Sequence, residues 1–471
     1  MGLRKRSAAL GAVAGAAAAA LAIAGCSSST STTPAATGSS TPAGTSSSSA
    51  ATSPSAAATG PATLTVWRMG GSVPSQVTWM NNVVKEFHTE FPQYANTQVV
   101  VKWVPWGNRT TDWNNALSSG KNIPDITELG NTDTPTEAAS GILGSLNTNL
   151  NSWSGTKGLV SGMLANDTQA GTTYAVPWFG GVRAVWYRTD QFKKAGITST
   201  PTTWAELQAD AVKLQSAYPG TTGFDAITND TNAFASFIWG AGGKIATQSN
   251  GKWTADLTSP QSQAAIKYYI GLYTTAKVSA SKYIGETELG VTGATSGGPN
   301  EDFGLGKLDL YIDGPWAKAE FPKNATDQAN WASFPIPSQN GPTQAPAFAG
   351  GSDFGVWVNS KFQTADWDLI KVMDSVGNST SFANALGFFP PYTSQLTGGA
   401  YAGNQLMSGF AKAATVTQIA PLNSKNWGTA DATDQIIPTM MKSLMQGANF
   451  TATVNKANTA LQNVLNTGKE S

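Results

Sequence analysis

The chain has 471 residues, with 29 Lys and Arg against 29 Asp and Glu, and this length suffices for two or three domains with large cores. After residue 60 the balance is 26 basic to 29 acidic residues, which argues against nucleic-acid binding because phosphate neutralisation needs a clear basic excess. A single Cys and a single His exclude a disulfide framework, a Cys/His zinc site and almost every His-dependent catalytic arrangement, so we expect no catalytic residue, no metal and no cofactor.

The first 25 residues are typical of a signal peptide. A basic head that ends at Arg6 is followed by residues 7–25, which are small, apolar and uncharged. A retained transmembrane anchor is the alternative, because 19 apolar residues could just span a bilayer. Against it, Ile23-Ala24-Gly25-Cys26 resembles a bacterial lipobox. In a lipobox the Cys sulfur receives a diacylglycerol, and cleavage leaves this Cys as the N-terminal residue. We therefore predict a signal peptide at 1–25, lipidation of Cys26 and anchoring on the extracellular face of the cell membrane.

The lipidated Cys is followed by a segment without core-forming side chains. Residues 27–60 consist only of Ser, Thr, Ala, Gly and Pro, a composition that predicts a disordered linker over 26–60. A flexible chain of this length spans about 30 Å. A domain held on such a linker can reach a partner in the same membrane.

Strand and helix patterns alternate from residue 61 onward. This succession predicts an α/β fold with mostly parallel sheets and helices on both faces. The long extended stretch Tyr174–Arg188 interrupts the alternation, and its Gly180-Gly181 pair indicates a crossover between two lobes. Strands are expected at 64–67, at 98–104 as a buried strand, from 124, at 308–312 and at 354–358, with helices at 77–91, around 113–117, at 203–218, from 260 and near the C-terminus.

Aromatic residues gather where strands end. In an open α/β sheet, ligands bind beyond the carboxyl ends of the strands. Flat rings suit a pyranose, whose C–H bonds pack on the ring while its hydroxyls seek polar side chains. Trp186 and Trp357 lie inside strands and are expected in the core. The pattern favours a neutral polyol ligand, with the aromatic candidates Trp67, Trp103, Trp106, Trp178, Trp239 and Trp316 and the polar candidates Arg68, Glu128, Asn131, Asp230, Asn232 and Asp353.

Ten motifs in order along some 400 residues carry a family resemblance. They are LTVW (64–67), EFHTEFPQY (86–94), NIPDI (122–126), ASGILGSL (139–146), TTYAVPWFGGVRAVWYRTDQFKKAGI (172–197), TTWAEL (202–207), GAGGKI (240–245), DGPWAKAEF (313–321), FPIP (334–337) and AGGSDFGVWVNS (349–360). This series resembles the extracellular solute-binding proteins of bacterial ABC importers, in particular the sugar-binding group that includes maltose-binding protein.

The resemblance implies a fold and its division into lobes. The family has the type II periplasmic-binding-protein-like fold, with two α/β lobes that are joined by crossovers and close on the ligand by a hinge. Carried over, lobe one comprises residues 61–183 and 351–395, and lobe two comprises residues 184–350 and 396–471.

The resemblance also nominates ligand-binding residues. Trp316 stands where related sugar binders place a stacking aromatic, and Trp239 and Trp427 fall in segments that face the cleft. Maltose specificity does not carry over, because Arg-Met-Gly-Gly-Ser occupies 68–72 in place of charged residues after the first strand. The full predicted set is Arg68, Glu128, Asn131, Trp178, Asn232, Trp239, Trp316, Gly351, Asp353 and Trp427.

These features predict a lipid-anchored, monomeric receptor without a chemical step. It would capture a sugar, in our expectation an oligosaccharide, and deliver it to the permease of an ABC importer. One alternative is a secreted carbohydrate-active enzyme, which would need a carboxylate pair and turn over its substrate. The other is a receptor for a charged solute, such as a glycerophosphate ester or a polyamine, which would need a cluster of like charges in the cleft.

Overall fold

The computed structural model describes residues 60–287, 298–322, 324–396 and 403–470. The predicted signal peptide, Cys26 and residues 27–59 of the linker lie outside these ranges. Within the described ranges, no helix combines the length and the apolar character needed to cross a membrane.

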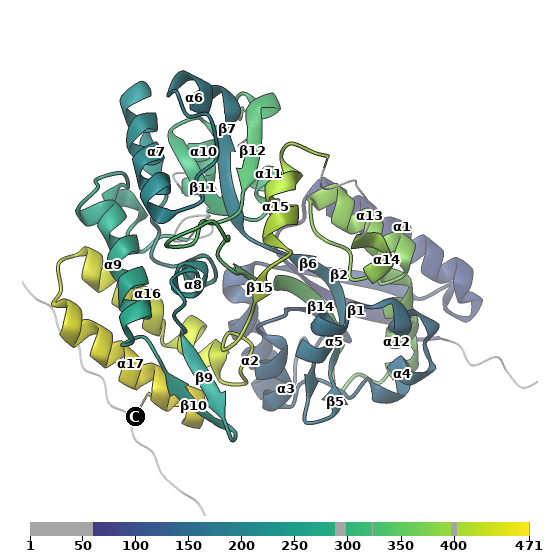
Figure 1. Cartoon of the computed structure of the whole chain (residues 1–471). Coiled ribbons are helices and arrows are strands. Elements are labelled where there is room, and N and C mark those ends of the chain that lie inside the picture. Colours follow the sequence, from purple (N-terminus) through teal and green to yellow (C-terminus); the bar gives the residue numbers. More distant parts are fainter. Residues whose placement is uncertain (1–59, 288–297, 323, 397–402, 471) are drawn as a thin grey trace, which may run out of the picture. The chain divides into compact units, whose positions relative to one another are not determined.

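A five-stranded sheet in the order β2-β1-β3-β14-β6 forms the centre of lobe one (Figure 1). β1 is parallel to β2 and β3, whereas β14 is antiparallel to β3 and β6. The strands are β1 (Thr63–Met69), β2 (Gln98–Val104), β3 (Ile126–Gly130), β6 (Ala175–Gly181) and β14 (Gly350–Val356).

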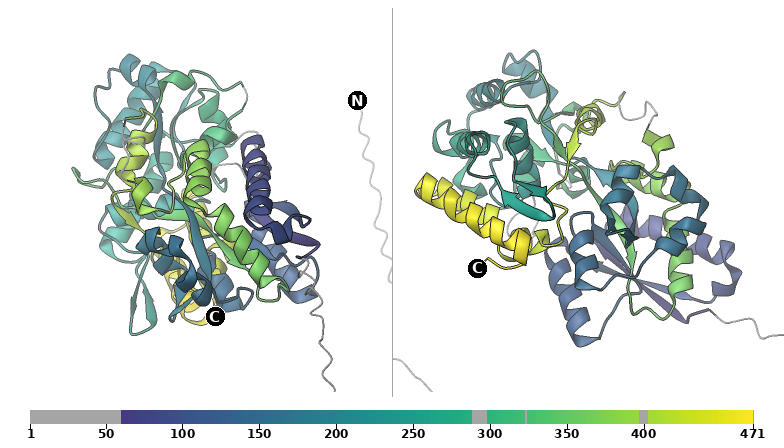
Figure 2. Two further views of the ribbon diagram at one scale, coloured as in Figure 1. Left: turned by 90° about the vertical axis from the view of Figure 1, so that its right-hand side faces the viewer. Right: turned by 60° about the horizontal axis from the view of Figure 1, so that its bottom comes forward.

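Helices cover both faces of this sheet. On one face, α1 (Pro74–Glu90) packs beside α12 (Gln363–Met373) and α13 (Val376–Leu386), as the purple and green helices in Figure 2 show. The buried residues of α1 recur at spacings of three and four, so one stripe of the helix faces the sheet. On the other face, Trp113 of α2 (Arg109–Ser119) packs in one cluster with Trp357. α3 (Thr134–Ser140) follows β3.

The second sheet, in the order β12-β7-β11-β8, forms the centre of lobe two. β7 is antiparallel to β11 and β12, and β11 is parallel to β8. The strands are β7 (Ala184–Arg188), β8 (Thr222–Phe224), β11 (Leu308–Asp313) and β12 (Trp331–Phe334), and the main helices of this lobe are α7 (Trp204–Ala217), α8 (Thr231–Gly240), α9 (Pro260–Thr274), α16 (Ile436–Met445) and α17 (Phe450–Thr467).

Shorter elements complete the two lobes. The hairpin of β9 (Ala246–Ser249) and β10 (Lys252–Ala255) lies against α17, drawn in yellow in Figure 2. The remaining elements are α4 (Asn147–Ser152), α5 (Ser161–Asn166), α6 (Thr189–Lys194), α10 (Pro299–Gly304), α11 (Ala317–Glu320), α14 (Thr393–Leu396), α15 (Met407–Ala413), β4 (Thr168–Gln169), β5 (Thr172–Thr173), β13 (Ala347–Phe348), β15 (Thr417–Gln418), the 3-10 turns η1 (Pro92–Tyr94), η2 (Trp106–Asn108), η3 (Ser154–Gly158), η4 (Ser281–Tyr283) and η5 (Gln328–Asn330), and the π-helix η6 (Thr429–Thr433).

Local sequence signals are confirmed where they depend on neighbouring residues. Thr203 and Glu206 form a capping box at the start of α7, in the helix expected at 203–218, and Ser259 caps α9. Asn250 and Gly251 both have positive φ in the turn between β9 and β10, which is the conformation that an Asn-Gly hairpin turn favours. Trp186 and Trp357 are fully buried, as expected.

The strand arrangement departs from the prediction in three places. Both sheets are mixed rather than mostly parallel, because β14 returns to the first sheet in the opposite direction and β7 runs against both of its neighbours. β2 is half-exposed rather than buried, since it is the edge strand of its sheet. The strand expected at 354–358 spans Gly350–Val356.

The two predicted crossovers lie side by side at the junction of the sheets. Gly180 and Gly181 of β6 pair with Gly351 and Gly350 of β14. A Cβ atom on Gly351 would lie 2.3 Å from the Phe179 carbonyl oxygen, so no side chain fits there. These four paired glycines form what we call the glycine ribbon. The lobe boundaries themselves, at 183/184, 350/351 and 395/396, remain a prediction.

Candidate ligand-binding site

The indole ring of Trp106 lies across the carboxyl ends of two strands of lobe one. A Cβ atom on Gly70, after β1, would lie 3.4 Å from the Trp106 Nε1 atom, and one on Gly130, at the end of β3, would lie 3.4 Å from its Cζ3 atom. Trp106 is nevertheless 37% exposed. The ring therefore presents a flat apolar surface at the edge where open α/β sheets bind ligands.

An ion pair stands beside this ring. The Arg109 Nε and Nη2 atoms donate to the two carboxylate oxygens of Asp133 at 2.7 and 3.0 Å, and Nη1 donates to the Trp106 carbonyl oxygen at 2.8 Å. The guanidinium carbon lies 5.6 Å from the Trp106 ring centroid. Bidentate pairing fixes the geometry of the guanidinium, and the third hydrogen bond ties it to the backbone of η2. Polar donors and acceptors thus border the aromatic surface.

Lobe two approaches this ion pair through the segment that includes Gly428 and Asp431. The backbone N–H of Gly428 donates to the Thr136 hydroxyl on α3 at 3.4 Å. Asp431, in η6, accepts a hydrogen bond of 2.6 Å from the Thr231 hydroxyl. Burial raises the pKa of Asp431, while Thr231 and the Arg109 charge across the junction act to lower it.

An unpaired acid completes this cluster on the lobe-one side. Burial raises the pKa of Glu137, on α3, to about 7, and the neighbouring Asp133 charge adds to the shift. A hydrogen bond from Ser140 and the Arg109 charge oppose it. The junction therefore holds three carboxylates around Arg109.

Trp316 stands at the second meeting point of the lobes. Its ring stacks on Phe388 of lobe one, with centroids 5.4 Å apart and planes at 26°. The Arg183 guanidinium carbon lies 5.4 Å from the centroid of the Trp316 ring. A Cβ atom on Gly181 would lie 2.7 Å from the Trp316 Cζ3 atom, so the ring rests directly on the glycine ribbon. Trp316 is half-buried and keeps part of its surface open.

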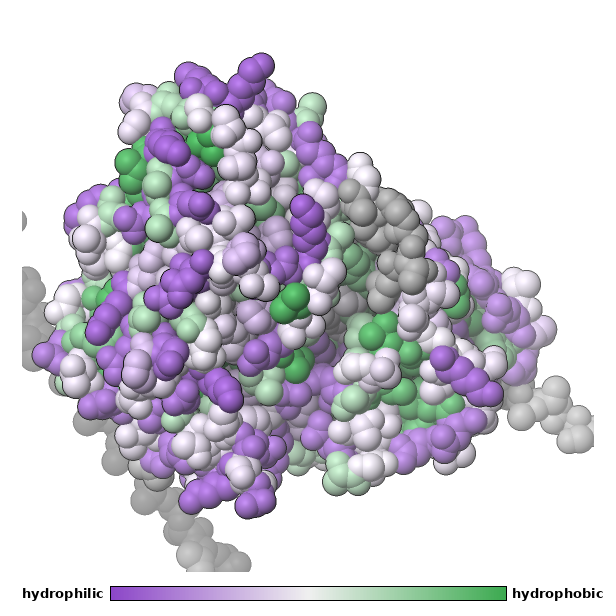
Figure 3. Space-filling view, viewed as in Figure 1, coloured by the Kyte–Doolittle hydropathy of each residue, from purple (hydrophilic) through white to green (hydrophobic). Residues whose placement is uncertain are grey.

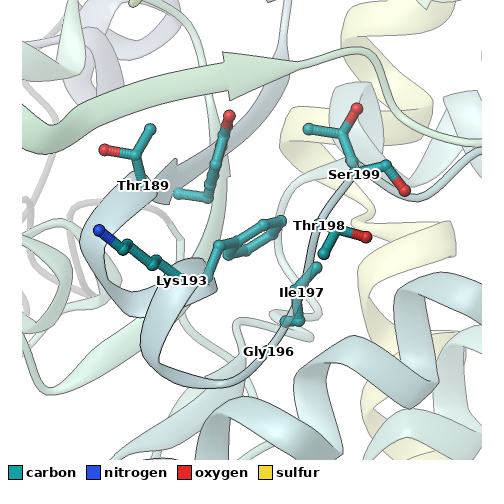
Figure 4. A pocket seen from close by; sticks show the side chains of 9 residues that line it. Thr189, Lys193, Gly196, Ile197, Thr198 and Ser199 are labelled. Carbon is teal, nitrogen blue, oxygen red and sulfur yellow. The ribbon is translucent and has the colours of Figure 1, made fainter.

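The surface is hollowed beside the segment that carries α15, and hydrophobic residues border the hollow (Figure 3). Two further cavities lie elsewhere: one of about 380 Å³ is lined by Thr189, Lys193 and Ser199, among others (Figure 4), and one of about 360 Å³ lies between α1 and α13. Neither is lined by a member of the predicted ligand-binding set. No group of three or more His, Cys, Asp or Glu suited to a metal ion occurs among the described residues.

Comparison with known families gives this arrangement a context. The family model of bacterial extracellular solute-binding proteins matches residues 70–378, about two thirds of the chain. The chain belongs to this family. The match spans most of lobe one, both segments of the glycine ribbon and the lobe-two sheet.

Individual relatives agree with this assignment. The solute-binding chain is 27% identical over 395 residues to the diacetylchitobiose binding protein DasA of Streptomyces coelicolor, with 82% of this chain and 85% of DasA covered. The GacH receptor of Streptomyces glaucescens, solved unliganded and with acarbose, superposes with a TM-score of 0.72 at 20% identity and covers 86% of this chain and 98% of its own. UgpB of Mycobacterium tuberculosis, solved with glycerophosphocholine, has a TM-score of 0.69 at 21% identity, over 86% of this chain and 98% of its own. These structures confirm the type II two-lobed fold.

Three of the predicted ligand residues lie inside lobe one of this solute-binding protein. The Arg68 Nε atom donates to the Glu128 carboxylate at 2.9 Å, and Trp178 lies 4.1 Å from the guanidinium carbon. Arg68 is 1% exposed, Glu128 2% and Trp178 0%. Trp178 is not at the crossover but within β6, where it packs against Phe354 and Phe382. In this structure these side chains contact the lobe interior rather than its surface.

Three further members of the set are also buried. Trp239 and Trp427 belong to the large hydrophobic cluster of lobe two. Asp353, in β14, accepts a hydrogen bond of 2.7 Å from the Thr134 hydroxyl, and burial raises its pKa to about 7. A role of Trp239, Trp427 and Asp353 in ligand binding therefore stays a prediction. Because all three side chains are buried, such a role would need a different arrangement of the lobes or an indirect effect.

The remaining members lie near the junction. Asn131 is half-buried, and its backbone N–H and its Nδ2 atom donate to the Gly351 and Ala349 carbonyl oxygens at 3.1 and 2.5 Å. It thereby ties the end of β3 to the glycine ribbon. Asn232 is half-buried in the first turn of α8. With Trp316 and Gly351, these residues are the part of the predicted set that the structure brings to the junction of the lobes.

The predicted set omitted the Arg109–Asp133 pair and the exposed Trp106. Trp106 was among the aromatic candidates, from its place after a strand, but was not carried into the final set. The ion pair was not recognisable from the sequence, because its partners are 24 residues apart and meet only once β2 and β3 have both paired with β1. Asp431 was missed for a similar reason, since only the packing of η6 against lobe one gives it a charged neighbour.

Proposed function

We propose that this protein captures a sugar between its two lobes and delivers it to the permease of an ABC importer. The observation that carries the proposal is the exposed Trp106 ring at the strand ends, bordered by the bidentate Arg109–Asp133 pair. An aromatic face with fixed polar groups at its edge suits a pyranose ring. Family membership and the likeness to DasA, whose name specifies a disaccharide, support the same reading.

The charges near the junction bear on the ligand class. Arg109 and Arg183 are each paired with a carboxylate, at 2.7 and 2.9 Å. Glu137 and Asp431 stand close by; burial raises the pKa of both groups, and in their ionised forms they give the region an acidic excess. An anionic solute such as a glycerophosphate ester would meet repulsion there. A neutral sugar fits best, and a cationic solute such as a polyamine is the second candidate, because the acidic excess favours it.

Closure would follow from the glycine ribbon. A ligand that contacts both lobes only when they are closed shifts the population toward the closed form by its differential affinity. No chemical step is part of this proposal, and we expect no turnover of the bound solute. Small-angle scattering should show a smaller radius of gyration when the sugar is added, whereas an unchanged curve at saturation would argue against hinge closure.

The location of the protein rests on its N-terminal sequence. We propose that the Cys26 sulfur receives a diacylglycerol, that cleavage leaves Cys26 as the N-terminal residue, and that the lipid holds the domain at the extracellular face of the membrane as a monomer. Two or three acyl chains give firm anchoring, whereas a single chain binds a membrane only marginally. Cys26→Ala should release the protein from membranes or leave an uncleaved precursor, with unchanged ligand binding by the folded part. Wild-type protein with an unmodified Cys26 in the soluble fraction would reject lipidation.

A thermal-shift screen tests the proposed ligand class. The panel would contain diacetylchitobiose, maltose, maltotetraose, glycerophosphocholine and spermidine. A sugar at one hundred times its dissociation constant should stabilise the protein by about 2.7 kcal/mol. Trp106→Ala should reduce that shift, while the control Trp253→Ala, on the β9–β10 hairpin, should leave it unchanged. Stabilisation by spermidine or glycerophosphocholine alone would overturn the sugar proposal.

A further inference from the structure

Arg183 occupies the two-residue link between β6 and β7, directly after the glycine ribbon. It is 8% exposed. Its Nε atom donates to the Asp230 carboxylate at 2.9 Å and lies 3.9 Å from the Asp313 carboxylate. Its guanidinium carbon lies 5.4 Å from the centroid of the Trp316 ring. One side chain therefore touches three groups from three different elements.

Two of these groups lie close in sequence to a ligand-binding candidate, and the third, Trp316, is itself one. The second carboxylate oxygen of Asp230 caps α8 by accepting from the Ala233 N–H at 3.0 Å, and Asn232 lies in that first turn. Asp313 ends β11, and its carboxylate accepts from the Gly314 N–H at 2.7 Å. Trp316 lies three residues after Asp313. Arg183 thus links the crossover to the α8 N-terminus and to the turn that presents Trp316.

The position of Trp316 depends on contacts from both lobes. Phe388 of lobe one stacks on its ring, and Arg183, in the link between the two lobes, is its charged neighbour. The Trp186 indole N–H donates to the Gly314 carbonyl oxygen at 3.2 Å, so a hydrogen bond from β7 also fixes the turn that precedes Trp316. A planar guanidinium can pair with carboxylates in its plane and still present a face to an aromatic ring, which an ammonium cannot do.

We propose that Arg183 is a positioning residue that orients Trp316 at the junction of the lobes and thereby sets the affinity for the captured sugar. It does this without contacting the sugar. The identity of the ligand as a sugar rests on the proposed function, but the placement of Trp316 can be tested without any ligand. In this proposal, the orientation of the Trp316 ring is fixed relative to the glycine ribbon, about which the lobes would close.

The first test is a fluorine NMR measurement on ligand-free protein labelled with 5-fluorotryptophan, with the Trp316 resonance assigned from Trp316→Phe. Arg183→Met should shift or broaden the Trp316 resonance and leave the resonance of the core residue Trp357 in place. The matched control is Arg188→Met, because Arg188 is also a buried arginine, at the end of β7, and pairs with two aspartates at 2.8 and 2.6 Å. The control should leave the Trp316 resonance unchanged.

The second test is calorimetric titration with diacetylchitobiose and maltotetraose. Arg183→Met should weaken binding about tenfold, as expected when one stacked ring is misplaced. Arg183→Lys keeps the charge without the planar fork, so it should restore thermal stability toward the wild-type value but not the affinity. If the wild-type protein binds neither sugar, the sugar proposal fails, whereas the fluorine measurement still decides the placement of Trp316.

A folded Arg183→Met variant with an unchanged Trp316 resonance would overturn the inference, and so would an equal effect of Arg188→Met. Should Arg183→Met fail to fold, Arg183→Lys and Asp230→Asn take its place. Arg183→Lys keeps a cation in the link, Asp230→Asn keeps the arginine but removes the charge of its partner, and both should move the Trp316 resonance. An unchanged resonance in these two variants would equally reject a positioning role.

Discussion

Arg68 and Arg183 are both buried and both pair with a carboxylate, but the two arginines lie in different surroundings. Arg68 is sealed inside lobe one, with Glu128 at 2.9 Å and the rings of Trp79, Trp103, Trp178, Phe354 and Phe382 all within 6.0 Å of its guanidinium carbon. Arg183 lies in the link between the two lobes, with Asp230 at 2.9 Å and the Trp316 ring centroid 5.4 Å from its guanidinium carbon.

The difference separates a stabilising role from a positioning role. The partners of Arg68 all belong to one sheet and the helices on it, so they move together whatever the angle between the lobes. The Trp316 ring beside Arg183 also contacts Phe388 of the other lobe. The same residue type in the same kind of ion pair therefore fills the interior of lobe one at Arg68 and, in our proposal, orients Trp316 of lobe two at Arg183.

The largest expected effect comes from breaking the pair inside lobe one. Arg68→Met leaves the Glu128 carboxylate buried, with only the Met69 N–H still donating to it at 2.9 Å. Removing one partner of a buried ion pair costs about 3–5 kcal/mol. Urea unfolding should show a loss of this size, while the sugar affinity of the folded protein stays the same.

The double variant Arg68→Met/Glu128→Gln is the control, because an uncharged amide removes the isolated charge and should recover part of the lost stability. A variant that keeps its stability but loses sugar affinity would instead return Arg68 to the ligand site where the sequence had placed it.

How far the sequence alone leads can be judged from particular residues. The capping box of Thr203 and the turn at Asn250-Gly251 were predictable, because their geometry depends on residues two or three positions apart. The burial of Trp178 was not. Its strand continues to Gly181, and the ring is enclosed by the packing of α1 and α13 on the sheet. The burial of Arg68 was not predictable for the same reason. An arginine at a strand end gives the same sequence pattern whether its side chain faces solvent or an aromatic interior.

Glu137 tests how a buried acid behaves without a cation of its own. Its neighbour Arg109 is committed to Asp133, and burial raises the pKa of Glu137 to about 7. The folded state therefore holds a proton that the unfolded state has lost between about pH 4.5 and 7, so stability falls as the pH rises through this range. Glu137→Gln has no such proton to lose. We expect it to be more stable than the wild type by about 1–3 kcal/mol at pH 8 and nearly equal at pH 4.5.

Urea unfolding at both pH values measures this difference, with Glu90→Gln as a control on an exposed face of α1. A Glu137→Gln variant with the same advantage at both pH values would show that the gain has another origin than the titration of this carboxyl group.

Trp316 and Trp178 differ in the same way as the two arginines, because one ring lies at the junction of the lobes and the other inside lobe one. The half-buried ring at the junction should contribute more to binding than to the fold, so sugar affinity should fall at least tenfold on Trp316→Ala, or about 1.4 kcal/mol. The fold should lose only about 1 kcal/mol, from the stack on Phe388. Trp178→Ala should show the opposite pairing, with about 3–5 kcal/mol of stability lost and affinity intact. Several kcal/mol lost on Trp316→Ala with unchanged affinity would make Trp316 a core residue.

The smallest effect is expected at an ion pair that is open to water, which extends the comparison from the sealed arginine and the junction arginine to a solvated lysine. The Lys102 Nζ atom lies 2.8 Å from the Asp112 carboxylate, as close as the buried pairs, but the two side chains are 43% and 30% exposed. Water solvates both charges whether or not they meet, and the long lysine side chain loses conformational freedom when it is held in place. Lys102→Ala should therefore cost less than about 1 kcal/mol. Lys102 also lies 4.0 Å from the Trp67 ring centroid, so any loss that remains at 1 M salt, where ion pairs are screened, measures that ring contact instead. A loss as large as that of Arg68→Met would mean that burial is not what distinguishes these pairs.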